Sequence, residues 1–155
     1  MTSNNEINRI IKDSCNDALG LEPYYLNSYE SLIAIWSTMI FKIAIKHNLS
    51  IDREDCEAYA KLLFPCFLAR CSDRAFIMIL SMGLSIGYNC YDVGRKFISP
   101  FFTWRFGFHF NNICENQASE KDFMKPERAE IKKLCNLPSS IQEIKDFFYF
   151  MRKKE

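Results

Sequence analysis

The sequence contains little glycine, proline or histidine and carries almost no net charge. Its 155 residues include 5 Gly, 5 Pro and 2 His, and 20 basic residues balance 19 acidic ones. So few glycines and prolines argue against a disordered or low-complexity chain. Because the charges nearly cancel, no overall field exists to hold nucleic acid, and we expect no nucleic-acid partner.

Motifs for nucleotide hydrolysis and metal binding are missing from the sequence. No Gly-x-x-x-x-Gly-Lys-Ser/Thr string occurs, so the chain lacks the loop with which P-loop enzymes hold phosphate. The best local pair of metal-type ligands is Cys66 and Cys71, which have no neighbouring histidine. We therefore predict neither a metal site nor a cofactor.

The two histidines and the seven cysteines also give no catalytic pattern. His47 suits the last turn of a helix, and His109 lies among phenylalanines, where a buried, hydrogen-bonded role is commoner than catalysis. The cysteines are odd in number, scattered, and without a Cys-x-x-Cys pair, which favours free thiols in a reducing interior. The opening MTSNNEINRIIKDSC does not resemble a signal peptide. We predict a cytoplasmic protein that is not an enzyme and has no catalytic residues.

The sequence does contain many aromatic residues, with 14 Phe, 7 Tyr and 2 Trp, and long stretches of helical periodicity. Gly20 is typical of a helix end, Ser28 and Ser72 of helix starts, and Ser140 with Glu143 of a capping box. We expect an all-α, single compact bundle of about six helices over residues 1–155, with a core at about 18–100 and a C-terminal helical extension at 101–155. The expected helices cover residues 4–19, 28–48, 50–70 or 52–70 with a kink or a shortening at Pro65, 72–99, 126–135 and 140–154.

The segment FFTWRFGFHF at 101–110 fits two secondary structures. Its aromatic residues alternate, as in a strand, but Phe102, Phe106 and Phe110 are also four apart, as on a helix face. Neighbouring helices favour the helix. WRFGFHF is similar to an aromatic RNA-recognition strand, but its arginine is not followed by glycine, so core or membrane-facing rings are favoured. The aromatic residues predicted to contact a partner or a membrane are Trp36, Phe101, Phe102, Trp104, Phe106 and Phe108.

Small residues recur in the stretch SMGLSIGYNCYDVGRKF at 81–97. On one continuous helix, Gly83, Gly87, Cys90 and Gly94 would share a face. Helix-interior glycines cost about 1 kcal/mol each, so a close helix contact should repay them. We therefore predict a glycine-faced central helix over 72–99 that packs tightly against the helix at 28–48.

Two stretches approach the composition of a membrane span. The uncharged run Ala75–Tyr91 is short, because a span needs about 20 apolar residues. The helix at 28–48 carries Lys42 and Lys46, whose charged ends would have to reach the membrane surface. Burial in a bundle and a hairpin that dips into a membrane beside a partner both fit this pattern.

The stretch ALGLEPYYLNSYESLIAIWSTMIFKIAIKHNLSID at 18–52 resembles the YcjF-like bacterial helical domain of unknown function, which occurs with Era-like GTPases. YDVGRKF at 91–97 resembles the glycine-centred helix end of that family. The resemblance covers about residues 18–98, and its residues in the first stretch are Pro23, Leu32, Ile33, Ile35, Met39, Ile40, Ile43, Ala44, Leu49 and Ser50. It implies a helical module that is associated with a membrane or works with a GTPase from another chain.

The leading hypothesis is therefore a non-enzymatic helical module, either peripheral at the inner membrane or acting with a GTPase partner in trans. The alternative hypothesis is a small soluble interaction protein of the immunity or inhibitor type. Such a protein would bind its partner through the aromatic segment at 97–110.

Overall fold

The described residues form seven helices and contain no strand. The computed structural model describes residues 4–22, 26–71, 73–83, 90–117, 128–134, 136 and 140–153. The all-α prediction is confirmed. The helices are α1 (Asn4–Asp17), α2 (Leu26–Lys46), α3 (Arg53–Cys71), α4 (Arg74–Gly83), α5 (Cys90–Asn116), α6 (Arg128–Leu134) and α7 (Ile141–Arg152).

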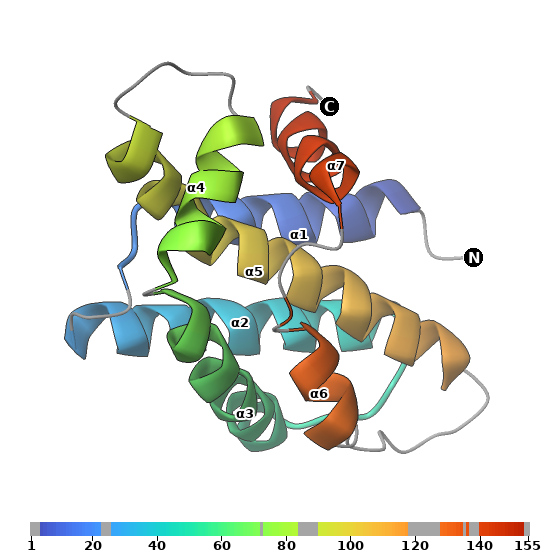
Figure 1. Ribbon diagram of the computed structural model, residues 1–155. Coiled ribbons are helices and arrows are strands. Elements are labelled where there is room, and N and C mark those ends of the chain that lie inside the picture. The colour runs from blue at the N-terminus through green and yellow to red at the C-terminus, as the bar shows by residue number, and fades with distance from the viewer. Residues whose placement is uncertain are drawn as a thin grey trace.

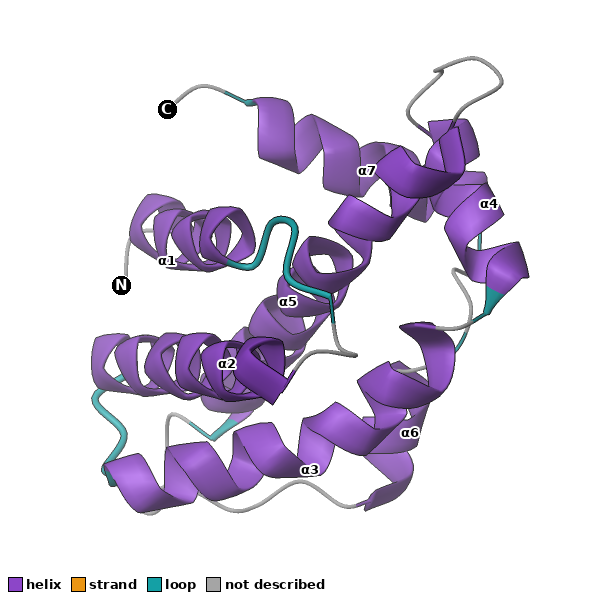
Figure 2. Cartoon of the chain, turned by 90° about the vertical axis from the view of Figure 1, so that its left-hand side faces the viewer, coloured by secondary structure: helices purple, strands orange, loops and turns teal. Residues whose placement is uncertain are grey.

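Helix α5 is the central helix of the bundle. In Figure 1 it runs diagonally through the middle of the molecule, and it contacts α1, α2, α3, α4 and α6. Figure 2 shows α1 and α2 side by side and α3 beneath α2. Helix α4 packs mainly against α5 and α7, whereas α2 packs against α3, α5 and α1. The predicted tight pair of the second helix with the helix at 72–99 is therefore wrong.

The expected single helix at 72–99 is divided between two helices. Helix α4 ends at Gly83, α5 begins at Cys90, and Ser72 and Gly87 lie outside the described residues. Helix α5 also continues through Pro100, where the sequence predicted an end. Likewise, α3 continues through Pro65 to Cys71.

A contact from the end of α1 explains how α5 accommodates Pro100. Proline has no N–H group, so the carbonyl of Lys96, four residues earlier, loses its partner within the helix. The backbone N–H of Gly20 donates to this carbonyl at 3.2 Å. Gly20 has φ +79°, a left-handed conformation that favours glycine and that ends α1 as predicted. The same residue therefore ends one helix and satisfies another.

Local capping residues define several other helix ends. Before α3, the Asp52 side chain accepts a hydrogen bond from the N–H of Asp55 at 2.7 Å. Before α7, the Ser140 hydroxyl accepts one from the N–H of Glu143 at 3.3 Å, as the predicted capping box requires. At the end of α2, Asn48 has φ 57° and the N–H of Leu49 bonds to the carbonyl of Ala44, which is a Schellman arrangement. Ser28, the predicted cap of α2, lies inside the helix instead.

The abundant phenylalanines form an aromatic core around α5. The Trp36 ring meets Phe106 edge-on at 4.9 Å, and Phe102 stacks on Phe76 at 5.4 Å. The Trp36 indole N–H donates to Thr103 Oγ1 at 2.8 Å, so its polar atom is satisfied. Buried residues extend from Ile7 in α1 to Phe148 in α7, so the core extends beyond the expected limits of 18–100 on both sides.

Candidate functional site

Only one of the four predicted helix-packing residues has a side-chain environment that the structure describes. A Cβ atom added to Gly94 would lie 2.2 Å from Ser81 Oγ and 2.9 Å from the carbonyl oxygen of Ile77. Gly94 thus allows α5 to approach the backbone of α4. Gly83 belongs to α4, Cys90 and Gly94 belong to α5, and Gly87 lies outside the described residues, so the four do not share one helix face.

Four of the six aromatic residues predicted to contact a partner or membrane lie in the core instead. Trp36, Phe101, Phe102 and Phe106 are at most 1% exposed. The cause is the four-residue spacing within α5, which turns Phe102, Phe106 and Phe110 toward the interior. Trp104 and Phe108 lie on another face of α5 and are half-buried. Only these two remain as surface contacts.

Trp104 and Phe108 line a pocket of about 450 Å³, which we call the α5–α6–α7 pocket. Its walls come from α5, from α6 and Asn136 beyond it, and from the first turn of α7. The lining residues are Trp104, Arg105, Phe108, His109, Asn112, Lys133, Leu134, Asn136 and Glu143.

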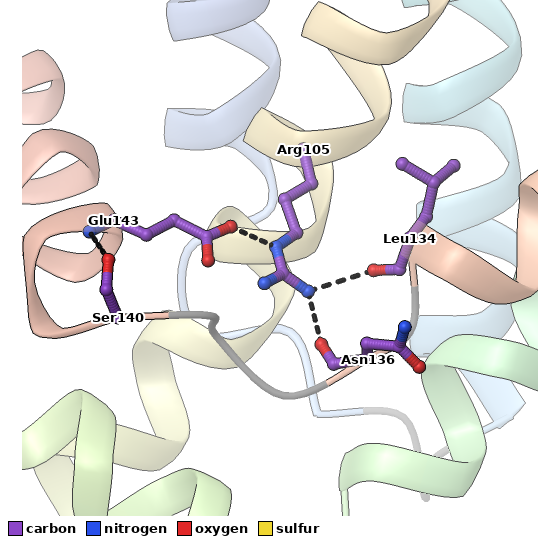
Figure 3. Close-up of polar contacts among 5 residues, drawn as sticks. All are labelled: Arg105, Leu134, Asn136, Ser140 and Glu143. Carbon is purple, nitrogen blue, oxygen red and sulfur yellow. Dashed lines mark hydrogen bonds and ion pairs between the residues drawn. The ribbon is translucent and has the colours of Figure 1, made fainter.

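Arg105 holds the three walls of this pocket together (Figure 3). Its Nε donates to Glu143 in α7 at 2.7 Å, and its Nη1 donates to the carbonyls of Leu134 at 2.9 Å and Asn136 at 2.5 Å. The guanidinium also lies over the Phe101 ring at 4.7 Å. Because the Arg105 side chain is only 10% exposed, these bonds replace its lost hydration.

Two nitrogen atoms of the pocket residues have no hydrogen-bond partner in the described part of the chain. They are Nε1 of Trp104 and Nε2 of His109, and both are sealed from solvent. Burial lowers the pKa of His109, although the charge of Glu130 opposes this shift. The imidazole is therefore neutral at pH 7, and its Nε2 atom can accept or donate a hydrogen bond according to its tautomer.

The chemistry of the pocket suits a ligand group that accepts hydrogen bonds beside an apolar body. Lys133 and Asn112 are exposed lining residues whose side chains can donate hydrogen bonds. The rings of Trp104 and Phe108, 5.9 Å apart, supply the apolar wall. A carbonyl or carboxylate oxygen on a side chain with an apolar stem has the complementary chemistry.

Neither histidine forms a catalytic pair with a cysteine among the described residues. His47, directly after α2, bonds through Nε2 to Asn111 Oδ1 at 2.8 Å, and the Asn111 amide donates to Glu115 at 2.9 Å. Burial raises the pKa of Cys56 to about 11 and of Cys114 to about 12, so both are neutral thiols at pH 7. The described cysteines Cys15, Cys56, Cys66, Cys71 and Cys114 form no disulfide, and the described residues contain no cluster suited to a metal ion.

One described helix could cross a membrane by length and composition alone. It is the stretch Asn27–Lys46 of α2, whose mean hydropathy is 1.2. Within the most apolar 18 residues of this stretch, 44% are buried inside the protein. The core helix of a soluble protein can have the same length and composition. Trp36, Met39, Ile40 and Ile43 of this helix are fully buried against other helices.

Comparison of the chain with protein-family models, with curated proteins and with solved structures finds no match.

Sequence reasoning overlooked Arg105, which organises the pocket. A single arginine within an aromatic run looks like the exposed position of a helix. The available signal was the four-residue spacing, because Phe101 and Arg105 share a helix face, and Phe101 is buried.

Proposed function

We propose that this protein is a non-enzymatic helical module that binds a protein partner through the α5–α6–α7 pocket. The observation that carries the proposal is the pair of half-buried rings, Trp104 and Phe108, which line the pocket beside Arg105. The Trp104 indole N–H has no acceptor among the described residues, which costs about 1–3 kcal/mol, and a partner's oxygen atom would recover this free energy if the ring turns toward it.

The residue types of the pocket also suit protein recognition. Tryptophan and arginine dominate the energetic centres of protein interfaces, where they lie in pockets surrounded by weaker contacts. Arg105 fixes the pocket walls before binding, so a partner would lose less free energy to ordering them. The pocket favours the alternative hypothesis, in which the aromatic segment at 97–110 contacts the partner. Within that segment, the contact is proposed for Trp104 and Phe108 alone.

The proposed class of partner is a GTPase supplied by another chain. This class rests on the resemblance of residues 18–98 to the YcjF-like domain. The proposed location is the cytoplasm, with peripheral attachment at the inner membrane as the second arrangement. The apolar stretch of α2 favours that second arrangement, although its core contacts oppose insertion.

The experiment compares the proteins retained from a cell extract by the wild type and by two pocket variants. Trp104→Phe keeps a ring and removes the N–H, whereas Phe108→Ala removes apolar wall. Leu62→Ala is the matched control, because Leu62 is a partly exposed apolar residue of α3, outside the pocket. Retained proteins are identified by mass spectrometry, purified and titrated against each variant by calorimetry.

We expect Phe108→Ala to weaken binding of the partner by about tenfold or more, and Leu62→Ala by less than about twofold. Equal affinity for the wild type and both pocket variants would overturn the proposal. Loading the extract with GDP or with a non-hydrolysable GTP analogue tests the class of partner, because retention that ignores the nucleotide contradicts a GTPase. Flotation with phosphatidylglycerol vesicles tests the membrane arrangement, which is wrong if the protein stays below the vesicles.

A further inference from the structure

A second cavity, of about 500 Å³, lies between α1 and α7. We call it the α1–α7 groove. Both helices lie on the same side of α5 (Figures 1 and 2). The groove is lined by Asn5, Glu6, Asn8, Arg9, Lys12, Tyr149, Phe150 and Lys153.

The charges available in this groove are positive. Among the described residues that line the groove, the single acidic one is Glu6. It pairs with Lys46 of α2 at 2.7 Å, and the hydrogen bond from Lys46 lowers the pKa of Glu6. The remaining charged groups are Arg9, Lys12 and Lys153. With Glu6 already paired, the groove presents three cations to a ligand.

Two of these cations are placed to act together. Arg9 and Lys12 are three residues apart on α1, so their side chains emerge on the same face. The Lys12 ammonium donates to the backbone carbonyl of Lys153 and keeps two further donors. Arg9 is exposed and makes no hydrogen bond or ion pair with another described residue.

Beside the cations lies an aromatic surface. Tyr149 is 69% exposed, the largest fraction among the exposed large hydrophobic residues. Phe150 forms part of the wall and packs edge-on against Phe108 at 5.5 Å, so the groove backs onto the ring that also lines the α5–α6–α7 pocket. A ligand in the groove would therefore meet positive charge on α1 and aromatic rings on α7.

We propose that the α1–α7 groove binds an acidic peptide segment of a partner protein, with carboxylates on Arg9 and Lys12 and an apolar side chain on Tyr149. The span from Asn5 to Lys12 is about 10 Å at the helical rise of 1.5 Å per residue, which matches an extended stretch of about three residues. A flat membrane surface cannot enter a concave groove of this size. The site is separate from the α5–α6–α7 pocket and does not depend on the function proposed for it.

The test uses the full chain and a fluorescein-labelled hexapeptide of alternating glutamate and leucine, with its glutamine counterpart as the peptide control. Binding is measured by fluorescence polarisation at low and high salt. The variants are Arg9→Gln and the double change Arg9→Gln with Lys12→Gln. The matched control is Lys42→Gln with Lys132→Gln, which removes the same charge from exposed lysines outside the groove.

We expect the double groove variant to bind the acidic peptide about tenfold or more weakly, Arg9→Gln to give an intermediate loss, and the control to stay within about twofold. Binding should weaken in high salt, and the glutamine peptide should bind less well. Circular dichroism melting checks that each variant is folded, and Arg9→Gln remains informative if the double variant unfolds.

The proposal is overturned if the wild type does not bind the acidic peptide or if the control loses as much affinity as the groove variant. It is also overturned if phosphatidylglycerol vesicles bind through Arg9 while the peptide does not, since the groove would then be a lipid site. Trp104→Phe should leave peptide binding unchanged, which separates this test from that of the pocket.

Discussion

Replacing Gly94 by alanine tests the close approach of α4 and α5 directly. The added Cβ atom would lie 2.2 Å from Ser81 Oγ and 2.9 Å from the backbone oxygen of Ile77. The hydroxyl can rotate away, but it then gives up its hydrogen bond to that same oxygen, at 2.8 Å. The backbone oxygen itself can move only if α4 moves.

The expected change in the free energy of unfolding follows from three contributions. Losing the Ser81 hydrogen bond costs about 1 kcal/mol. Overpacking that displaces a helix costs about 1–3 kcal/mol. Alanine returns about 1 kcal/mol, because it favours a helix more than glycine does. We therefore expect Gly94→Ala to destabilise the protein by about 1–3 kcal/mol, or about 2–4 °C in Tm for each kcal/mol.

Gly107→Ala is the matched comparison, because it has the same helix propensity gain on the same helix. Its added Cβ would meet side-chain atoms, Ile11 Cγ1 at 2.8 Å and Met39 Sδ at 3.1 Å, and methionine adjusts readily. Urea denaturation should show a smaller loss for Gly107→Ala than for Gly94→Ala. Combining Ser81→Ala with Gly94→Ala should recover part of the loss. The reasoning fails if Gly94→Ala is neutral or stabilising, or if the double variant shows no coupling.

Three further outcomes can be measured by urea denaturation. Arg105→Lys should lower the free energy of unfolding by about 2 kcal/mol, because a lysine ammonium cannot donate to Glu143 and to both backbone carbonyls as the planar guanidinium does. An unchanged midpoint of the urea transition would contradict this prediction. The free energy of unfolding should fall as the pH rises above 9.0. In the folded state the thiols of Cys56 and Cys114 have pKa values of about 11 and 12, so the unfolded state loses these protons first. A free energy of unfolding that stays constant up to pH 10.5 would refute this prediction. The free energy of unfolding should also fall as the pH drops below 6.5, because burial lowers the pKa of His109 in the folded state and the unfolded state takes up the proton first. His109→Gln should make this pH dependence weaker. An equal slope in the wild type and the variant would exclude His109 as its source.

Helix ends defined by local chemistry could be predicted from the sequence. Gly20 and Ser140 act through their own backbone conformation or through a residue three positions away, so a short window contains the signal. The bundle class was predictable for the same reason, since helical periodicity is a property of each segment.

The course of α5 through Pro100 could not be predicted locally. Proline normally ends a helix because one carbonyl loses its partner, and here the replacement donor comes from Gly20, far away in sequence. Two further contacts join the same regions: Arg95 pairs with Glu22 at 2.6 Å, and Ser99 Oγ donates to the carbonyl of Leu21 at 2.5 Å. Helix α5 thus depends on contacts with residues 20–22, and a short stretch of sequence around Pro100 does not show that these residues lie beside it.

The aromatic segment shows why residue types alone misplace a surface. Its pattern predicted a helix correctly, but it did not predict which rings would be covered. Phe102 and Phe106 are buried because α2 and α3 supply Trp36 and Phe67 opposite them. The choice of the covered face is thus made by neighbouring helices.

The same spacing explains why α5 has an aromatic face left for a partner. Residues four apart fall on one face, so Phe102 and Phe106 define the core side, and Trp104 and Phe108 define another. A helix that is apolar on more than one face needs more than one cover. Helices α6 and α7 supply the second cover only in part: Arg105 bonds to both of them, and the pocket lies between them and α5. The uncovered part includes the half-buried rings of Trp104 and Phe108, so an added apolar cover would complete the burial of this face.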